Sequence, residues 1–310
     1  MINKIKEDFI SGRISKSEFI DAMYLNHKLL FEYVELLKKV DIDSIDINKE
    51  SVVFTTKEDN IKFISHRADK RTAPFEIMNF GNYESQDANL LYDLISDGDT
   101  IFDIGANIGW YSLVFAKKRI SSIVHSFEPI IETYESLILN VKLNALKNII
   151  CNNFGFSNEA RTTTFYTSLH TSVSNSAVNI TDDIYAKEVI CEVITLDSYA
   201  YQRGVKVDVI KCDVEGAELF VYEGGEKTIA NNLPIVFTEM LRKWSAKFGY
   251  HPNDIILFFS RFGYNCFFVN SNLELQKIMS INNNTPNTNF FFLHPDKHAS
   301  ILNKYESKEH

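Results

Sequence analysis

Residues 100–109 constrain the fold of this chain more than any other segment. They read Thr-Ile-Phe-Asp-Ile-Gly-Ala-Asn-Ile-Gly, a short apolar run that enters a turn with two glycines, and residues 110–118 continue with helical character. Gly105 lets the backbone turn sharply and approach a ligand, and Gly109 permits close contact between helix and sheet. The first amides of a helix lack intrahelical partners, so they are left to face a ligand. This order predicts an α/β sheet with a ligand site at the strand end.

The residues of this turn also limit what the ligand can be. Two glycines spaced Gly-x-x-x-Gly do not satisfy the three-glycine Gly-x-Gly-x-x-Gly pattern of dinucleotide sites. Asp103, just before the turn, suits a cationic ligand better than a diphosphate. S-adenosylmethionine (SAM) carries an ammonium and a sulfonium, and we therefore expect SAM as the cofactor.

Composition excludes several other classes of protein. A chain of 310 residues with 45% hydrophobic content can form a large α/β domain with an added subdomain. The net charge of −9 argues against a general surface for nucleic acid or anionic membrane. No run approaches membrane-spanning length, and the N-terminus lacks the apolar core of a signal peptide. Four widely spaced cysteines predict buried free thiols in a cytoplasmic protein, without a disulfide framework or zinc site: Cys151, Cys191, Cys212 and Cys266.

Strands and helices alternate from residue 86 onward. Predicted strands are 100–104, 122–127, 148–154, 207–212 and 234–239; predicted helices are 86–96, 108–118, 130–143, 216–230 and 253–262. Such alternation implies a mostly parallel sheet covered on both faces. Residues 161–195 interrupt it as a β-rich excursion, and two final strands, 264–269 and 289–293, predict an antiparallel hairpin at one edge.

Residues 1–85 form a different region. Apolar residues recur at helical spacing over residues 2–40, and a capping box at residues 15–18 predicts the start of a second helix. The stripe of that helix includes Phe19, Met23, Leu30, Val34 and Leu37; it either packs on its own domain or forms a dimer contact. Residues 51–56 and 61–65 predict a β-hairpin. We expect residues 1–85 to be a dimer or acceptor-side appendage and residues 86–310 to be the catalytic domain.

Acidic residues end two further strands. Glu128, followed by Pro129, lies one strand-helix unit after the glycine turn, where a carboxylate can accept both ribose hydroxyls of a nucleoside cofactor. Asp213 ends the strand 207–212 and should face the same crevice as Asp103. Glu215 and Glu218 follow it; Glu218 lies about a turn inside the next helix and is expected to cap it.

The chain resembles the FkbM-type family of SAM-dependent methyltransferases from about residue 98 to residue 240. The resemblance rests on five segments in order: residues 98–109, Phe-Glu-Pro at 127–129, Thr-Leu-Asp at 195–197, Asp-Val-Glu-Gly-Ala-Glu at 213–218 and Pro-Ile-Val-Phe-Thr-Glu at 234–239. It implies a seven-stranded, Rossmann-like methyltransferase sheet and, commonly, O-methylation of sugars or secondary metabolites.

Matching the family residue by residue assigns the cofactor site. Asp103, Gly105, Asn107 and Gly109 match the SAM turn, and Glu128 matches the ribose-binding acid. Asn107 could hydrogen-bond the amino-acid part of the cofactor or hold the turn through its own backbone.

Transfer to a hydroxyl requires a base, because the acceptor loses its proton. Asp213, Glu215 and Glu239 are the candidates, and His294 is a weaker fourth; Glu239 could instead pair with Arg242, and His294 could cap an edge strand. A divalent ion bridging these carboxylates is compatible with the pattern but not required, so no metal is predicted.

The expected function is SAM-dependent O-methylation of a sugar in surface-glycan or secondary-metabolite biosynthesis. Aromatic and basic side chains before the catalytic domain could line the acceptor site, and the acceptor could be a nucleotide-linked or phosphorylated sugar. These side chains are His66, Arg67, Arg71, Phe80 and Tyr83. The alternatives are a non-carbohydrate acceptor such as a polyketide, an NAD-dependent oxidoreductase, and an inactive SAM-fold binding protein.

Overall fold

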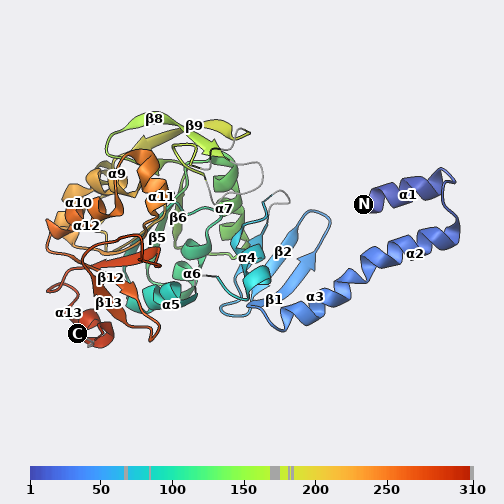
Figure 1. Ribbon diagram of the computed structural model, residues 1–310, viewed down its shortest axis with the longest axis horizontal. Helices are drawn as coiled ribbons and strands as arrows, with labels where there is room; N and C mark the ends of the chain where they lie inside the picture. Colours follow the sequence, from blue (N-terminus) through green and yellow to red (C-terminus); the bar gives the residue numbers. More distant parts are fainter. Residues whose placement is uncertain (66–68, 84, 168–174, 181, 183–184, 308–310) are drawn as a thin grey trace.

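The computed structural model describes residues 1–65, 69–83, 85–167, 175–180, 182 and 185–307. An α/β body holds most of the chain, and an N-terminal helical arm extends from one side of it (Figure 1). Among the described residues, no helix combines the length and apolar character that crossing a membrane requires.

A mixed sheet of eight strands forms the centre of the body, in the order β13-β12-β14-β11-β10-β4-β5-β6. The parallel part consists of β6 (Ile149–Asn152), β5 (Ile123–Phe127), β4 (Thr100–Ile104), β10 (Val209–Cys212) and β11 (Ile235–Glu239). The antiparallel part consists of β14 (Asn289–Leu293), β12 (Asn265–Val269) and β13 (Leu275–Ile278). The predicted fold class is confirmed, and each parallel strand lies within its predicted range.

The antiparallel edge differs from the prediction in one respect. β14 lies between β11 and β12, and β13 adds an eighth strand beyond the seven expected. β13 reads Leu-Gln-Lys-Ile and has two exposed polar residues in its middle. A short edge strand of this kind lacks the apolar run by which the other strands were recognised.

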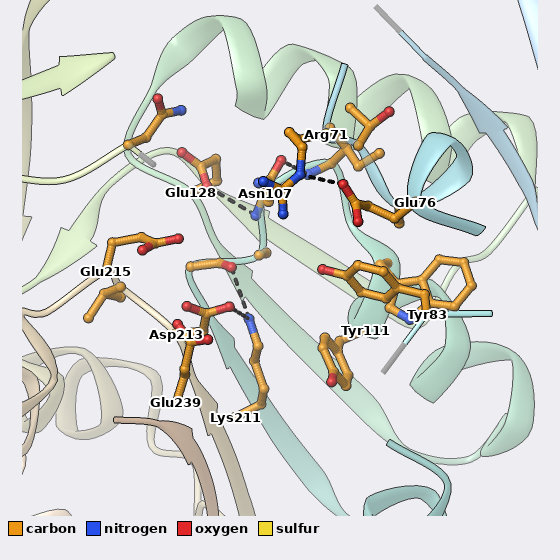
Figure 2. A pocket seen from close by; sticks show the side chains of 18 of the residues that line it. Arg71, Glu76, Tyr83, Asn107, Tyr111, Glu128, Lys211, Asp213, Glu215 and Glu239 are labelled. Carbon is orange, nitrogen blue, oxygen red and sulfur yellow. Dashed lines mark hydrogen bonds and ion pairs between the residues drawn. The ribbon is translucent and has the colours of Figure 1, made fainter. Parts of the chain in front are cut away.

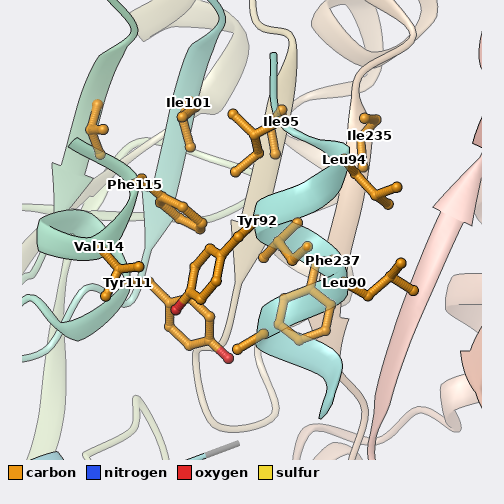
Figure 3. Close-up of a cluster of buried hydrophobic side chains, with 14 of the residues drawn as sticks. Leu90, Tyr92, Leu94, Ile95, Ile101, Tyr111, Val114, Phe115, Ile235 and Phe237 are labelled. Carbon is orange, nitrogen blue, oxygen red and sulfur yellow. The ribbon is translucent and has the colours of Figure 1, made fainter. Parts of the chain in front are cut away.

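Two apolar cores cover the two faces of the sheet. The first joins the sheet to α5 (Ser85–Leu94), α6 (Trp110–Lys118), α7 (Ile131–Leu143) and α13 (Ala299–Tyr305), and Figure 3 shows part of it around Tyr92, Phe115 and Phe237. The second joins the sheet to α8 (Leu196–Arg203), α9 (Glu218–Glu223), α10 (Glu226–Asn232) and α12 (Pro252–Ser260). Coverage on both faces explains why the parallel strands are apolar throughout rather than alternating.

The helix predicted over residues 216–230 is two helices, α9 and α10. Gly224 and Gly225 separate them, and a Cβ at Gly224 would come within 2.1 Å of the Ser157 carbonyl oxygen. Ser157 directly follows β7 (Gly155–Phe156), so the break between the two helices contacts a second, three-stranded sheet. This sheet consists of β7, β9 (Lys187–Ile194) and β8 (Arg161–Thr167). β8 and β9 confirm the predicted β-rich excursion.

The N-terminal region contains a second small sheet, β1 (Ile42–Ile47), β2 (Val52–Thr56) and β3 (Lys62–Ile64). β2 and β3 are the predicted hairpin, whereas β1 and the helix α4 (Ala73–Phe80) were not predicted. β3 is fastened to α7: the backbone amides of Lys62 and Ile64 donate to the side chains of Asn144 and Asn140, both at 2.8 Å.

The helical arm consists of α1 (Ile2–Ile10), α2 (Lys16–His27) and α3 (Leu29–Leu37), and no residue in these helices is buried. The rings of Phe9 and Phe19 stack at 4.4 Å, and Ser15 with Glu18 forms the predicted capping box. Leu36 and Leu37, at the end of α3, pack against the body. Leu37 of the predicted stripe thus packs on its own domain, whereas Leu30 and Val34 are exposed, and the dimer contact remains a prediction.

Replacing Asp197 tests how the helices on the second face are joined. Its carboxylate accepts hydrogen bonds from the backbone amides of Lys227 and Thr228, at 3.1 and 2.7 Å, and from the Thr228 hydroxyl at 2.7 Å. We expect Asp197→Ala to lower the free energy of unfolding in urea by about 2 kcal/mol, because the first turn of α10 loses its cap. Asp197→Asn keeps an acceptor oxygen and should lose less; equal stability of all three proteins would contradict this role.

Candidate functional site

A cavity of about 500 Å³ opens at the carboxyl ends of β4, β5, β10 and β11 (Figure 2). This is the edge at which open α/β sheets bind ligands. The glycine turn and the loops after β5 and β10 form one side of the cavity. The other side comes from α4, the residues after it and α11 (Arg242–Ser245).

Gly105 and Gly109 serve close packing in different ways. Gly105 has φ of +73°, and a Cβ there would lie 1.8 Å from the Asp213 carbonyl oxygen, so the turn touches the end of β10. Gly109 has φ of +96°, and its Cβ would lie 2.6 Å from the Leu137 side chain of α7. Gly105 lines the cavity, whereas Gly109 makes room for helix packing, against a helix rather than the sheet.

Asn107 holds the turn. Its φ is +50°, and its side-chain oxygen accepts a hydrogen bond from the Ile108 amide at 2.8 Å. Its own amide donates to Glu128 Oε2 at 3.0 Å. The backbone role left open by the sequence is thus observed.

Glu128 lies at the centre of the predicted cofactor side. Its side chain is buried and accepts hydrogen bonds from the amides of Asn107 and Ile130, each at 3.0 Å. Burial raises its pKa to about 7 although these two bonds oppose the shift. A carboxyl group with this pKa changes charge near neutral pH.

Asp103 lies beneath the turn rather than on the cavity wall. Its side chain is fully buried, Ser112 donates a hydrogen bond to Oδ2, and Oδ1 lies 3.4 Å from Lys211 Nζ. Its direct contact with a cofactor remains a prediction. The observed contacts give it a supporting position behind Gly105.

Asp213, Glu215 and Glu239 converge on the opposite side, as predicted. Each can place one carboxylate oxygen within 4.8 Å of the others, a spacing compatible with a cation. Burial raises the pKa of Glu215 well above its usual range, and the charges of Asp213 and Glu239 add to the shift. In Figure 2, Asp213 and Glu239 lie together beside Lys211, and Glu215 lies on the left of the view, between that pair and Glu128.

Glu218 organises the loop between Asp213 and α9. Its Oε1 accepts hydrogen bonds from the amides of Val214 and Gly216, at 3.1 and 3.0 Å, and Tyr250 donates to Oε2 at 3.2 Å. The side chain is buried, and burial raises its pKa to about 7. Both amides belong to the loop before α9, and Glu218 is the first residue of that helix rather than a residue one turn inside it. The side chain therefore orders the loop, and the capping role expected from the sequence is not what is observed.

Lys211 was not predicted as a site residue, yet it lines the cavity from within β10. Its side chain is 5% exposed, and Nζ donates to the Gly105 carbonyl at 3.1 Å. Nζ also lies 3.7 Å from Asp213 Oδ2 and 5.2 Å from the centre of the Tyr111 ring. The available signal was a lysine inside the apolar strand Val-Ile-Lys-Cys, because a charge there needs partners.

Three of the five residues expected to line an acceptor are on the cavity wall, and contact with an acceptor remains a prediction. Arg71, Phe80 and Tyr83 line the cavity, and Arg71 forms an ion pair with Glu76. His66 and Arg67 lie outside the described residues. Further lining residues that sequence reasoning missed are Trp110, Tyr111, Lys243 and Trp244.

His294 is excluded as a base by strand direction. β14 runs antiparallel to β11, so Asn289 pairs with Glu239 at the cavity edge and His294 follows the opposite end of the strand. There its Nδ1 accepts a hydrogen bond from the Lys297 amide at 3.3 Å. Arg242, the alternative partner of Glu239, donates to Asn283 Oδ1 at 2.7 Å.

Comparison with solved structures finds methyltransferases at low sequence identity. Methyltransferase FkbM from Methylobacillus flagellatus KT is 15% identical, with a TM-score of 0.41 over 64% of this chain and 44% of that chain. Precorrin-6y C5,15-methyltransferase from Geobacter metallireducens GS-15 is 8% identical, with a TM-score of 0.40 over 73% of this chain and 90% of that chain. A TehB-like SAM-dependent methyltransferase from Corynebacterium glutamicum ATCC 13032 Kitasato is 12% identical, with a TM-score of 0.36 over 69% of this chain and 90% of that chain.

This chain therefore spans less than half the length of the Methylobacillus protein. No curated protein sequence matches it. The family profile described as the methyltransferase FkbM domain matches residues 103–266, which include Asp103, the glycine turn, Glu128 and the three converging carboxylates. Because this match covers more than half of the 310 residues, the chain belongs to the FkbM methyltransferase family.

Proposed function

We propose that this protein is a SAM-dependent O-methyltransferase that acts on a sugar hydroxyl in surface-glycan or secondary-metabolite biosynthesis, in the cytoplasm. One observation carries the proposal: a single cavity joins the glycine turn and Glu128 to the carboxylates Asp213, Glu215 and Glu239. A methyl donor and a hydroxyl acceptor must meet in one such space, and a base must be near the acceptor.

The residues present fit SAM. Gly105 gives a surface without a Cβ, and Glu128 offers carboxylate oxygens for ribose hydroxyls. Asp213 Oδ1 is buried and accepts no hydrogen bond within the described part of the chain, so it is an acceptor ready for an ammonium group. Bound SAM would supply an electrophilic methyl group, and Asp103 would support its turn from beneath.

The three carboxylates are suited to receive the proton of the acceptor. Glu215 and Glu239 line the cavity beside Asp213. Because burial and neighbouring charges raise the pKa of Glu215, it is a stronger base than an exposed carboxylate once ionised. We assign the acceptor side to Asp213 and Glu239, with Glu215 beside them.

Residues 71–83 support an acceptor role for part of the N-terminal appendage. Phe80 and Tyr83 offer rings on which a sugar can stack, and Arg71 and Lys243 offer cations for a phosphorylated or nucleotide-linked form. Lys243 Nζ lies 4.0 Å from the centre of the Trp244 ring. A polyketide is the alternative acceptor and would use the same apolar rings.

Calorimetric titration tests the cofactor. We expect micromolar binding of SAM and S-adenosylhomocysteine (SAH) and no binding of NAD. Glu128→Gln should weaken SAH binding by about tenfold or more, because an amide accepts ribose hydroxyls less well than a carboxylate. Glu132→Gln is the matched control, since Glu132 forms an exposed ion pair with Lys187. Binding of NAD in place of SAH would favour an oxidoreductase, and binding of none of the three would favour an inactive scaffold.

The pKa of Glu128 predicts a pH dependence for the same measurement. It is raised from 4.5 to about 7, so the unliganded fold loses stability as pH rises through 7, when the buried carboxyl group must ionise. SAH affinity should rise over the same range, because the ionised form accepts the ribose hydroxyls. Melting temperatures and dissociation constants from pH 5.5 to 8.5 check both trends, and a wild-type slope retained in Glu128→Gln would count against this assignment.

Amide substitutions test the acceptor side. In a screen of sugar acceptors, Glu239→Gln, Glu215→Gln and Asp213→Asn should lower the rate of methyl transfer by roughly 10²–10⁴ for the residue that takes the proton. Glu239→Gln should still bind SAH, since Glu239 lies across the cavity from Glu128. Glu226→Gln, in an exposed ion pair with Arg261, is the control. Wild-type rates in all three variants would remove the general-base role.

We also propose that the arm pairs with a second copy of this chain. Twelve large apolar side chains among residues 1–34 are exposed, including Phe31 at 71% and Ile10 at 83%. At about 80–100 Å² each they present roughly 1,000 Å² of apolar surface, more than the about 800 Å² that one partner gives to a standard interface. Residues 1–39 carry 7 basic and 6 acidic residues, a net charge of +1, against −10 for the remainder. Two arms therefore repel one another far less than two acidic bodies do.

Sedimentation equilibrium tests this pairing. We expect twice the 35.7 kDa chain mass for the wild type, and the chain mass for Leu30→Glu combined with Val34→Glu. Glu32→Gln on the same helix is the control and should stay dimeric. A monomer at every concentration, or a complex that survives the double substitution, would contradict the proposal.

A further inference from the structure

Lys211 is a buried charge whose position the family assignment does not explain. It lies in β10, between β4 and β11, with its side chain 5% exposed. An ammonium group in such a place is costly unless it has charged or hydrogen-bonding partners. Its partners are therefore the clue to its role.

These partners belong to two different strand ends. Lys211 pairs in register with Asp103 of β4, and its Nζ lies 3.4 Å from Asp103 Oδ1 and 3.7 Å from Asp213 Oδ2. The same Nζ donates to the Gly105 carbonyl at 3.1 Å. One ammonium thus holds the glycine turn against the end of β10, at the point where Gly105 and Asp213 are in closest contact.

The charge of Lys211 also reaches the rest of the cavity. It lowers the pKa values of Glu128 and Glu215 against the larger effect of burial, although the two lie in different loops. Tyr111 covers its other side, with the ring centre 5.2 Å away. In Figure 2, Lys211 lies below the turn and points toward Asp213. The ammonium therefore offsets part of a strongly acidic surface.

We propose that Lys211 is a positioning and specificity-determining residue: it fixes the glycine turn against Asp213, and its charge sets how strongly the cavity prefers the SAM sulfonium over the neutral thioether of SAH. This inference rests on the proposed use of SAM. Two carboxylates without Lys211 would attract the sulfonium more strongly, because opposite charges interact strongly at low dielectric.

Charge substitutions with opposite signs test the proposal. Lys211→Met removes the ammonium at similar length, Lys211→Arg keeps the charge, Asp103→Asn removes one carboxylate, and the Asp103→Asn/Lys211→Met double variant restores the original net charge. Calorimetry at pH 8.5 gives the affinities for SAM and SAH, and thermal unfolding identifies variants that fail to fold.

We expect Lys211→Met to weaken SAH binding by about tenfold, because the Gly105 carbonyl loses its donor. Its SAM-to-SAH affinity ratio should rise by about threefold or more, and that of Asp103→Asn should fall. Lys211→Arg and the double variant should return the ratio close to the wild-type value. A loosened fold would weaken both ligands equally and leave the ratio unchanged.

Two results would overturn the inference. The first is a SAM-to-SAH affinity ratio in Lys211→Met that equals the wild-type ratio. The second is a ratio in Asp103→Asn that stays at the wild-type value, and this result can be obtained even if Lys211→Met does not fold. Failure of the proposed function is distinct, because the wild-type protein would then bind neither SAM nor SAH.

Discussion

The structure depends on the contact between two strand ends in the middle of the sheet. β4 and β10 are parallel neighbours in a register that places Asp103 beside Lys211, and beyond them the Gly105 turn meets the Asp213 carbonyl with no room for a Cβ. This contact places the two halves of the cavity side by side. The loops that carry Glu128, Glu215 and Glu239 then only need to follow their own strands to reach the same space.

The parallel core could be predicted because its signals are local. Each buried strand is an apolar run bounded by a turn, and each was found within its predicted range. The edge and the N-terminal region follow weaker rules. β13 is short and half polar, β1 has a mixed burial pattern, and the break at Gly224 serves a contact with Ser157, which is distant in sequence. Features set by tertiary contacts cannot be predicted from periodicity.

The site shows the same division. Chain order and strand ends were enough to name Asp213, Glu215 and Glu239 together as candidates for one role, and these three carboxylates lie close together in the structure. How deeply a side chain lies relative to the cavity wall could not be predicted. Asp103 lies near the end of its strand, as expected, but its side chain is beneath the turn. Lys211 was not predicted because an isolated lysine in a strand does not by itself indicate a site. His294, the weaker fourth candidate, lies away from the cavity because the direction of the edge strand decides which of its ends meets the cavity.

The hydrogen bonds that close the fold join segments far apart in the chain. β3 is fastened to Asn140 and Asn144 of α7, and Asp87 of α5 accepts from Asn289, 202 residues later. During synthesis, the bonds that fasten the small N-terminal sheet can form only after α7 has emerged, and the bond between Asp87 and Asn289 only after the last strand of the sheet has emerged. The wall formed by residues 71–83 lies between these two attachments. The cavity is therefore among the last parts of the protein to take shape as the chain emerges from the ribosome.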